Sequence, residues 1–513
     1  MNPASSDLLQ RLSRLESRPA HAGDDAAAYF EFGRDALQAG RADLTVRALQ
    51  RLTQRPVGDP VIWRLLGFAC REEQEMTEAV RAFVRSAAID PTNEQTAFGH
   101  AQSCLDAGLP SIALFEHALR LSPGNPGALR NYATALASEG RADAAETLLV
   151  AALADHPDWL DGHRRLAALR WTAGDAQGFA RSYEAACRAQ PQNLALRMAW
   201  FRAIAQVRDW DAARAILDTG RRILGDSPAL QVAELFVASE SGDRARADAL
   251  FLQTQDLHDE VRDLAFIRHS LRTGRADAAE PVASRLVGTR SAPLVWPYLS
   301  LIWRLGNDAR AQWLDGSPPL VRVLDLPFAP GELETLAATL RGLHTANAPY
   351  VEQSVRGGTQ TDGHVLLRHE PALQDARRRI RAAVRQYIDE LPASVPGHPL
   401  LGTPREQILF EGSWSVRLKR QGFNVAHTHP MGWISSAFYV SLPSVAQLGS
   451  PPAGWIRFGT PPPELGLDLP PTHQVEPRPG RLALFPSTMW HATVPFDDGE
   501  RLVLAFDVRV PRY

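Results

Sequence analysis

Three histidines near the end of the chain have the spacing of a metal site. His427 and His429 stand one residue apart beside a strand-like run, and a β-strand would point both imidazoles to the same face. His491 follows another strand-like run, Arg481 to Phe485. Neutral imidazole is a good ligand for Fe(II) or zinc, and three such ligands can occupy one face of an octahedron. These residues therefore predict a metal centre whose opposite face is open to small molecules.

An arginine accompanies the histidines. Arg501 opens the apolar strand that follows His491, and an arginine can hold a carboxylate through two parallel hydrogen bonds. The alternative is that His427 and His429 make ordinary hydrogen bonds or face solvent in a barrel that has lost its metal. The presence of His491 and Arg501 together favours the metal centre, with a 2-oxo acid as co-substrate.

A β-rich domain is needed to bring these residues together. The composition changes at the break Asp315 to Pro319, after which two helices are expected at Pro330–His344 and Ala372–Leu391. Helices followed by many short strands indicate a β-sandwich or barrel with a helical flank. The predicted strands are Val321–Leu326, Trp414–Leu418, Phe423–His427, Ile434–Leu442, Trp455–Phe458, Arg481–Phe485 and Leu502–Val508.

The part of the chain before this domain is a repeat array. Glycine turns recur every 32 to 34 residues, as at Gly108, Gly140 and Gly174, and prolines recur out of phase with them. Proline suits the start of a helix and glycine its end, so each repeat is expected to be a pair of helices. The clearest repeat runs from Pro126 to His156. The period and the alternation of small and large residues resemble tetratricopeptide repeats, and such solenoids usually bind protein or peptide.

The C-terminal part resembles a second family. The pattern His427-x-His429-Pro followed by Ser435-Ser-Ala-Phe-Tyr-Val, and Leu484-Phe-Pro-Ser with His491 and Arg501 after it, is similar to Fe(II)- and 2-oxoglutarate-dependent oxygenases. A branch of that family is often joined to tetratricopeptide repeats in bacteria. The resemblance implies a multidomain α + β protein, in which an α-solenoid precedes a double-stranded β-helix (jelly-roll) with flanking helices. The expected divisions are an N-terminal segment at 1–26, the solenoid at 27–314 and the oxygenase-like domain at 315–513.

The same resemblance implies roles for individual residues. His427 and His491 would be metal ligands, and His429 would stand where the superfamily has a carboxylate. A histidine there leaves the site one negative charge short, which weakens metal binding. Alternatively, only one histidine of the pair binds the metal and a water completes its coordination. Asp497 or Asp498 are weak candidates for the missing carboxylate, because they fall in an expected turn.

The co-substrate and substrate contacts are expected from other residues. Arg501 would bind the distal carboxylate of 2-oxoglutarate, with Tyr439 or Arg417 as further contacts. The polar, Gly-rich segment between the two expected helices is predicted as a loop over the pocket or as a simple structural turn. Its candidate substrate contacts, together with a tryptophan beside the histidine pair, are Gln353, Arg356, Thr359, Gln360 and Trp433.

The composition of the chain argues against a nucleic-acid partner, a membrane span and a disulfide framework. The 513 residues carry a formal net charge of -3, which gives no general reason to expect a nucleic-acid partner. No stretch is apolar for long enough to span a bilayer, and no secretory signal is recognisable. Three widely spaced cysteines, Cys70, Cys104 and Cys187, suggest no disulfide framework. A cytoplasmic location is therefore expected.

The sequence predicts an Fe(II)- and 2-oxoglutarate-dependent dioxygenase that hydroxylates a protein or peptide recruited by the solenoid. Fe(II) would be the metal, and 2-oxoglutarate and dioxygen the co-substrates. Two alternatives stay open. One is a three-histidine dioxygenase that uses no 2-oxo acid, and the other is a non-catalytic scaffold with a degenerate oxygenase domain.

Overall fold

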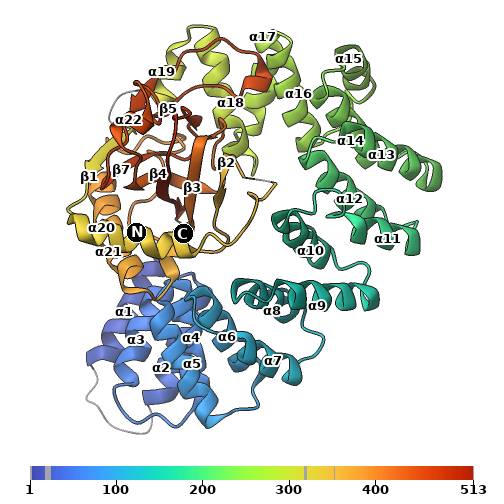
Figure 1. Ribbon diagram of the computed structural model, residues 1–513. Coiled ribbons are helices and arrows are strands. Elements are labelled where there is room, and N and C mark those ends of the chain that lie inside the picture. The colour runs from blue at the N-terminus through green and yellow to red at the C-terminus, as the bar shows by residue number, and fades with distance from the viewer. Residues whose placement is uncertain (1–2, 18–24, 317–319, 352, 512–513) are drawn as a thin grey trace. The chain divides into compact units, whose positions relative to one another are not determined.

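The computed structural model describes residues 3–17, 25–316, 320–351 and 353–511. The chain divides into two compact units. The first comprises Met1–Leu149, Gly363–Arg377 and Pro511–Tyr513, and the second comprises Val150–Asp362 and Arg378–Val510. Each unit contains part of the helical array, and the second also contains the β-sheet domain (Figure 1).

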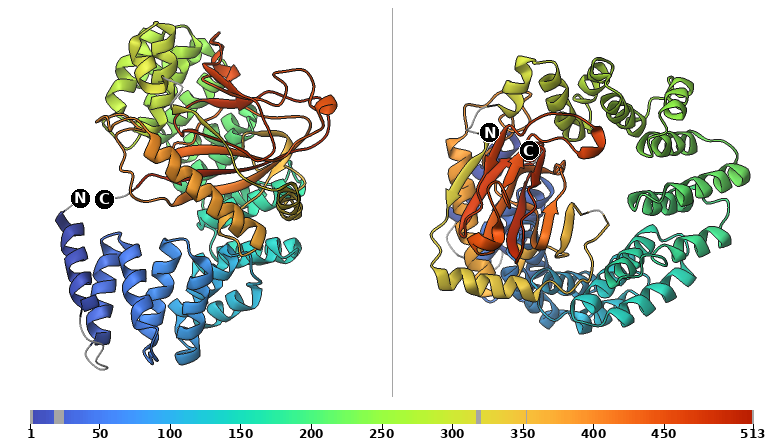
Figure 2. Two further views of the ribbon diagram at one scale, coloured as in Figure 1. Left: turned by 90° about the vertical axis from the view of Figure 1, so that its left-hand side faces the viewer. Right: turned by 45° about the horizontal axis from the view of Figure 1, so that its top comes forward.

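The helices of the first unit stand side by side in the left panel of Figure 2. They are α1 (Pro3–Ser17), α2 (Asp25–Gln38), α3 (Ala42–Leu52), α4 (Pro60–Glu72), α5 (Met76–Ile89), α6 (Glu94–Asp106), α7 (Ile112–Leu121), α8 (Pro126–Ser138) and α9 (Ala142–Asp155), the last of which continues into the second unit.

The α8–α9 pair shows how the sequence sets the boundaries of a repeat. The Asn125 side chain accepts a hydrogen bond from the Ala128 backbone N–H at 3.0 Å, and Pro126 fills the first turn of α8. At the other end, Gly140 has φ +81°, a left-handed conformation that glycine adopts without a steric penalty. The predicted order of proline, helix, glycine turn and helix is therefore confirmed.

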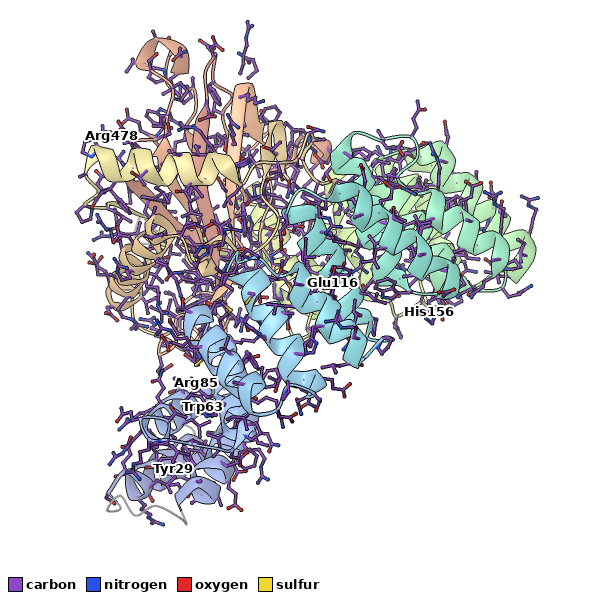
Figure 3. All side chains as sticks on the ribbon, turned by 60° about the horizontal axis from the view of Figure 1, so that its bottom comes forward. Tyr29, Trp63, Arg85, Glu116, His156 and Arg478 are labelled. Atoms are coloured by element: carbon purple, nitrogen blue, oxygen red, sulfur yellow. The ribbon has the colours of Figure 1, made fainter. Side chains whose placement is uncertain are left out.

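Small residues let neighbouring repeats approach closely. The ring of Phe83 in α5 lies against Gly67 of α4 and Gly99 of α6, where an added Cβ would come within 2.8 and 2.6 Å of it. Tyr29, labelled in Figure 3, is buried in α2 and donates its hydroxyl hydrogen to the Leu15 carbonyl at 3.2 Å. The core of the first unit is therefore built between consecutive helices.

The helices of the second unit follow a curved path among themselves, shown mainly in green in the right panel of Figure 2. They are α10 (Leu160–Ala173), α11 (Arg181–Ala189), α12 (Leu194–Gln206), α13 (Trp210–Leu224), α14 (Pro228–Glu240), α15 (Arg244–Gln253), α16 (Glu260–Arg272), α17 (Ala276–Leu286), α18 (Ala292–Leu305) and α19 (Ala309–Asp315).

The β domain consists of two antiparallel sheets with flanking helices. One sheet has the strand order β1-β7-β4-β9-β3-β2 and the other β6-β5-β8. The strands are β1 (Arg322–Asp325), β2 (Val355–Gln360), β3 (Phe410–Asn424), β4 (Gly432–Ser441), β5 (Ile456–Phe458), β6 (His473–Val475), β7 (Arg481–Pro486), β8 (His491–Thr493) and β9 (Arg501–Arg509). The flanking helices are α20 (Pro330–Gly342), α21 (Pro371–Glu390) and the short α22 (Val445–Leu448).

The two sheets share one apolar core. Tyr439 and Phe485 from the larger sheet pack in the same cluster as Ile456 and Phe458 from the smaller one. The central strand β4 is buried along almost its whole length, as expected for a strand that is covered on both faces. The predicted fold, a helical solenoid followed by a jelly-roll with helical flanks, is confirmed.

Two local expectations differ from the structure. The Gly-rich segment predicted as a loop forms strand β2, which pairs with β3 from Val355 to Gln360. Gly358 allows this close pairing, because a Cβ there would lie 2.2 Å from the Arg417 carbonyl oxygen. The two strands predicted on either side of Lys419 are one continuous strand, β3.

Within the second unit, the helical array holds loops of the β domain. The indole N–H of Trp490 donates to the Pro297 carbonyl of α18 at 2.9 Å, and Arg272 of α16 donates to the Glu464 carbonyl at 3.0 Å. Further along, the Trp171 indole of α10 donates to the Pro349 carbonyl at 3.0 Å. The array is thus part of the support of this domain.

In the described part of the chain, no helix has both the length and the apolar character that a bilayer crossing requires.

Candidate metal centre

Backbone pairing brings the three predicted histidines together. After β3 ends, His427 forms an isolated antiparallel bridge with His491 at the start of β8, with two N–H···O bonds of 3.1 Å. The His429 N–H donates to the Ser487 carbonyl at 2.9 Å. Residues separated by about sixty positions therefore meet because the ends of two strands are hydrogen-bonded to each other.

The geometry of the cluster suits one metal ion. One nitrogen from each imidazole lies within 4.8 Å of the others. The ring centroids are 4.2 Å apart for His427 and His491, and 5.0 Å apart for each pair that includes His429. Among the described residues, this is the single group of three or more His, Cys, Asp or Glu side chains with such spacing.

The second nitrogen of each ring fixes its tautomer. His427 Nδ1 lies 2.7 Å from the Val425 carbonyl oxygen, and His491 Nδ1 lies 3.1 Å from that of Met489. His429 Nδ1 lies 2.8 and 2.7 Å from the two carboxylate oxygens of Asp507. Carbonyl and carboxylate oxygens only accept, so Nδ1 must donate in all three rings. In a neutral ring, Nε2 then has the lone pair, which is the arrangement that metal-binding histidines usually have.

The electrostatic environment keeps His427 and His491 neutral. Burial and the nearby His429 lower the pKa of His427 to about 3. Burial, followed by the proximity of His427 and His429, holds the pKa of His491 well below its usual value. Neutral nitrogen donors that face one another suit a borderline cation such as Fe(II) or zinc, so the residues present fit the predicted metal.

One cavity residue that was not predicted from the sequence is Asp507. Asp507 is 7% exposed, lies near the end of β9 and contacts His429. His429 stands where a ligating carboxylate was expected, and a carboxylate is thus hydrogen-bonded to it. A signal for it was present: Arg501 and Asp507 are six residues apart on a strand, which places them on the same face. Asp497 and Asp498, the carboxylates considered instead, lie before β9 and do not line the cavity.

The predicted co-substrate arginine lies in the same cavity. Arg501 is 2% exposed, its Nε has no hydrogen-bond partner, and no described carboxylate pairs with it. Its guanidinium carbon lies 5.0 Å from the centre of the Tyr439 ring, whose hydroxyl is also buried without a partner. Burial lowers the pKa of Arg501 and raises that of Tyr439. A buried cation without a counter-ion is costly, so this position is suited to an anionic ligand.

Arg417 is placed differently. Its side chain forms an ion pair with Glu500, and it is absent from the cavity wall.

The predicted substrate contacts divide into two groups. Gln353 and Gln360 line the cavity. Arg356 instead donates to the backbone carbonyls of Gln353 and Val355, the Thr359 hydroxyl bonds His344 at 2.8 Å, and the Trp433 indole donates to the Leu400 carbonyl at 3.0 Å. Those three are engaged in structural contacts.

The cavity has a volume of about 540 Å³, within the usual range for small-molecule sites. Ser354 lies on its wall, with its hydroxyl 3.3 Å from His427 Nε2 and 2.9 Å from the Asn424 amide nitrogen. The Trp414 ring lies 5.3 Å from that of His429 at an angle of 30°. The metal-facing nitrogens therefore open onto a space bounded by polar and aromatic side chains.

Two segments of the chain match known families. Residues 412–507 match the family described as "Putative 2OG-Fe(II) oxygenase", and residues 111–169 match the tetratricopeptide repeat. The chain therefore contains a tetratricopeptide-repeat region and a domain of this oxygenase family, and both predicted resemblances are confirmed. A comparison with curated proteins finds no match.

Several solved structures are similar to parts of the chain. A tetratricopeptide repeat protein from Parabacteroides merdae is 14% identical and covers 49% of this chain and 94% of its own, with a TM-score of 0.30. The C-terminal part of a TPR repeat-containing protein from Cytophaga hutchinsonii is 14% identical, with 45% and 94% covered and a TM-score of 0.33. A Pseudomonas putida prolyl-4-hydroxylase is 19% identical, with 38% and 94% covered and a TM-score of 0.27.

Proposed function

We propose that this protein is an Fe(II)- and 2-oxoglutarate-dependent oxygenase that hydroxylates a polypeptide bound by its helical repeats. The observation that carries the proposal is the combination, in one cavity, of three imidazoles with converging Nε2 atoms and a buried arginine without a counter-ion. The first group supplies metal ligands, and the second supplies a carboxylate site.

Each of the chain's own groups has a defined task. His427, His429 and His491 would hold the metal, and Arg501 would bind the distal carboxylate of the 2-oxo acid in a bidentate manner. The buried Tyr439 hydroxyl is available to the same carboxylate. When Fe(II) is bound, it supplies the oxidising chemistry by which 2-oxoglutarate, dioxygen and a C–H bond give succinate, carbon dioxide and an alcohol.

The cavity wall favours an uncharged target side chain. Apart from the histidines, the charged lining residues are Arg501, assigned to the co-substrate, and Asp507, which is bonded to His429. The remaining wall offers the primary amides of Gln353, Gln360 and Asn424 beside apolar side chains. A charged side chain entering this space would lose water without gaining an ion pair, whereas the amides can bond to a peptide backbone.

The metal is tested first, by anaerobic Fe(II) titration of the wild type and of His491→Ala. We expect stoichiometric binding by the wild type and a loss of at least about 10-fold in affinity for the variant. Absence of binding by the wild type would leave the non-catalytic scaffold as the better account. Iron binding without 2-oxoglutarate binding would favour the three-histidine dioxygenase, to which the histidine at position 429 points.

The substrate is tested by incubating the iron-loaded protein with a cell lysate, with and without 2-oxoglutarate, and mapping residues that gain one oxygen atom. Hydroxylation confined to uncharged side chains, and absent with His491→Ala, is the expected result. Modification mainly of lysine, arginine, aspartate or glutamate would contradict the proposed target class.

A further inference from the structure

We propose that His429 and Asp507 act as one unit, in which the buried Asp507 carboxylate supplies through the imidazole the negative charge that a ligating carboxylate would otherwise supply. Asp507 is thus a positioning residue for the metal. This inference rests on the proposed function, and it concerns the third ligand position of the site.

The hydrogen bonds around Asp507 orient it toward His429. Its Oδ1 accepts from the Ser435 hydroxyl at 2.6 Å, and both of its oxygens lie within 2.8 Å of His429 Nδ1. Ser435 also contacts the Ser487 hydroxyl at 2.9 Å. A carboxylate only accepts, so the Ser435 hydroxyl donates its hydrogen to Asp507. The carboxylate is therefore held by one neutral donor, Ser435, and by the His429 imidazole.

The close packing around Asp507 restricts the movement of its side chain. Gly432, the first residue of β4, has no side chain where a Cβ would lie 2.6 Å from Ser487 Oγ and 3.0 Å from Asp507 Cβ. The close approach of β4, β9 and the residue that follows β7 holds Asp507 against His429. Because the ring is bonded at Nδ1, its Nε2 is directed to the other two histidines.

Within the described ranges, the Asp507 carboxylate has no cationic side chain beside it other than His429, should that ring be protonated. Among the described residues, His429 is the one basic side chain that bonds to Asp507, and no arginine or lysine forms an ion pair with it. A carboxylate with only 7% exposure is costly to bury unless a positive charge compensates it. A divalent cation at Nε2 would provide that compensation, and the hydrogen-bonded carboxylate would in turn make His429 a stronger donor. The total charge of the site then matches that of a site with two histidines and one carboxylate.

The test is anaerobic titration of the full-length protein with Fe(II), and with Co(II), whose visible absorption reports the coordination of the ion. Asp507→Asn retains the size and an acceptor for His429 but removes the charge, and we expect it to weaken metal binding by about 10- to 100-fold. Asp497→Asn, a carboxylate outside the cavity, is the matched control and should leave the affinity unchanged.

A second background separates this role from a merely structural one. In His429→Asp, the carboxylate is itself in the ligand position, so adding Asp507→Asn should change the metal affinity by less than about 3-fold. The inference would be overturned if Asp507→Asn lowered the metal affinity equally in the wild type and in His429→Asp. It would also be overturned if Asp507→Asn did not lower the metal affinity of the wild type.

The folding of each variant is checked by thermal melting without metal. If Asp507→Asn alone does not fold, the metal affinities of His429→Asp and of the double variant still test the inference. A much lower affinity of the double variant contradicts the inference, and an unchanged affinity supports it. Failure of the wild type to bind either metal would instead reject the proposed function, so the two failures are distinguishable.

Discussion

At the scale of single residues, the sequence was most informative where chemistry and spacing coincide. The H-x-H spacing of His427 and His429 and the position of Arg501 were sufficient to predict a shared cavity, and the structure places all three in its wall. Asp507 was not predicted because the expected carboxylate was one that would itself bind the metal. The carboxylate instead bonds to a ligand, and that relation depends on which strands are neighbours, since His429 and Asp507 are 78 residues apart.

The element scale shows why β2 could not be predicted. Glycines and polar residues are poor strand formers, yet Arg356 to Gln360 pair with β3 because the partner strand approaches too closely for larger residues at position 358. The strand preference of this segment is tertiary in origin. By contrast, the helices were predictable because proline and glycine mark both ends of a repeat.

The glycines that contact Phe83 give a prediction about helix packing in the first unit. Gly99→Ala would place a Cβ 2.6 Å from the ring, and such overpacking costs about 1–3 kcal/mol. We expect a lower melting temperature for the first unit, with Fe(II) binding unchanged. Gly124→Ala, where nothing lies within 4 Å, is the control. Equal melting temperatures for the two variants would mean that this contact relaxes easily.

The segment before β2 gives a prediction about the cavity wall. Asn347 donates to the Thr172 carbonyl at 3.1 Å and the Trp171 indole donates to Pro349, so α10 holds the segment that leads to Gln353 and Ser354. Trp171→Phe removes one of these bonds, worth about 1 kcal/mol. Amide hydrogen exchange should accelerate about 5-fold in residues 345–351. Unchanged exchange there, beside a control peptide from β4, would show that α10 does not restrain the wall.

A buried ion-pair network between α14 and α16 predicts a pH dependence. Burial alone would raise the pKa of Glu240, but the hydrogen bonds and charges of Arg268 and Arg272 outweigh it and lower the pKa to about 2. A folded-state pKa below the unfolded value, about 4.3, means that this stabilisation is present above pH 4.3 and is lost as the pH falls through 2.

Glu240→Gln should therefore lower the unfolding free energy of the second unit by about 3 kcal/mol at pH 7, and by progressively less between about pH 4 and pH 2. Urea unfolding at several pH values measures this difference. Glu184→Gln, whose side chain is 48% exposed beside Arg188, should have no effect at any of them. If the loss of unfolding free energy in Glu240→Gln did not change with pH, the ionic explanation would be contradicted.

At the scale of the whole molecule, the chain combines a helical repeat array with an oxygenase-family domain. Within the second unit the two are not merely consecutive, because α10, α16 and α18 bond to segments of the β domain, including the one that leads into the cavity wall. Composition and period were enough to predict both parts, whereas these contacts depend on loops whose sequences have no regular pattern. The proposed assignment gives the array two roles, to bind the polypeptide and to support the site.

The most direct test of the central claim is anaerobic calorimetry of 2-oxoglutarate binding to the Fe(II)-loaded protein. The wild type should bind the co-substrate. Arg501→Gln should retain Fe(II) but bind 2-oxoglutarate about 100-fold more weakly, because a bidentate charged contact is worth about 3 kcal/mol. Arg417→Gln, outside the cavity, should bind like the wild type. Equal affinity of the wild type and Arg501→Gln for 2-oxoglutarate, or no binding by the wild type, would contradict the account.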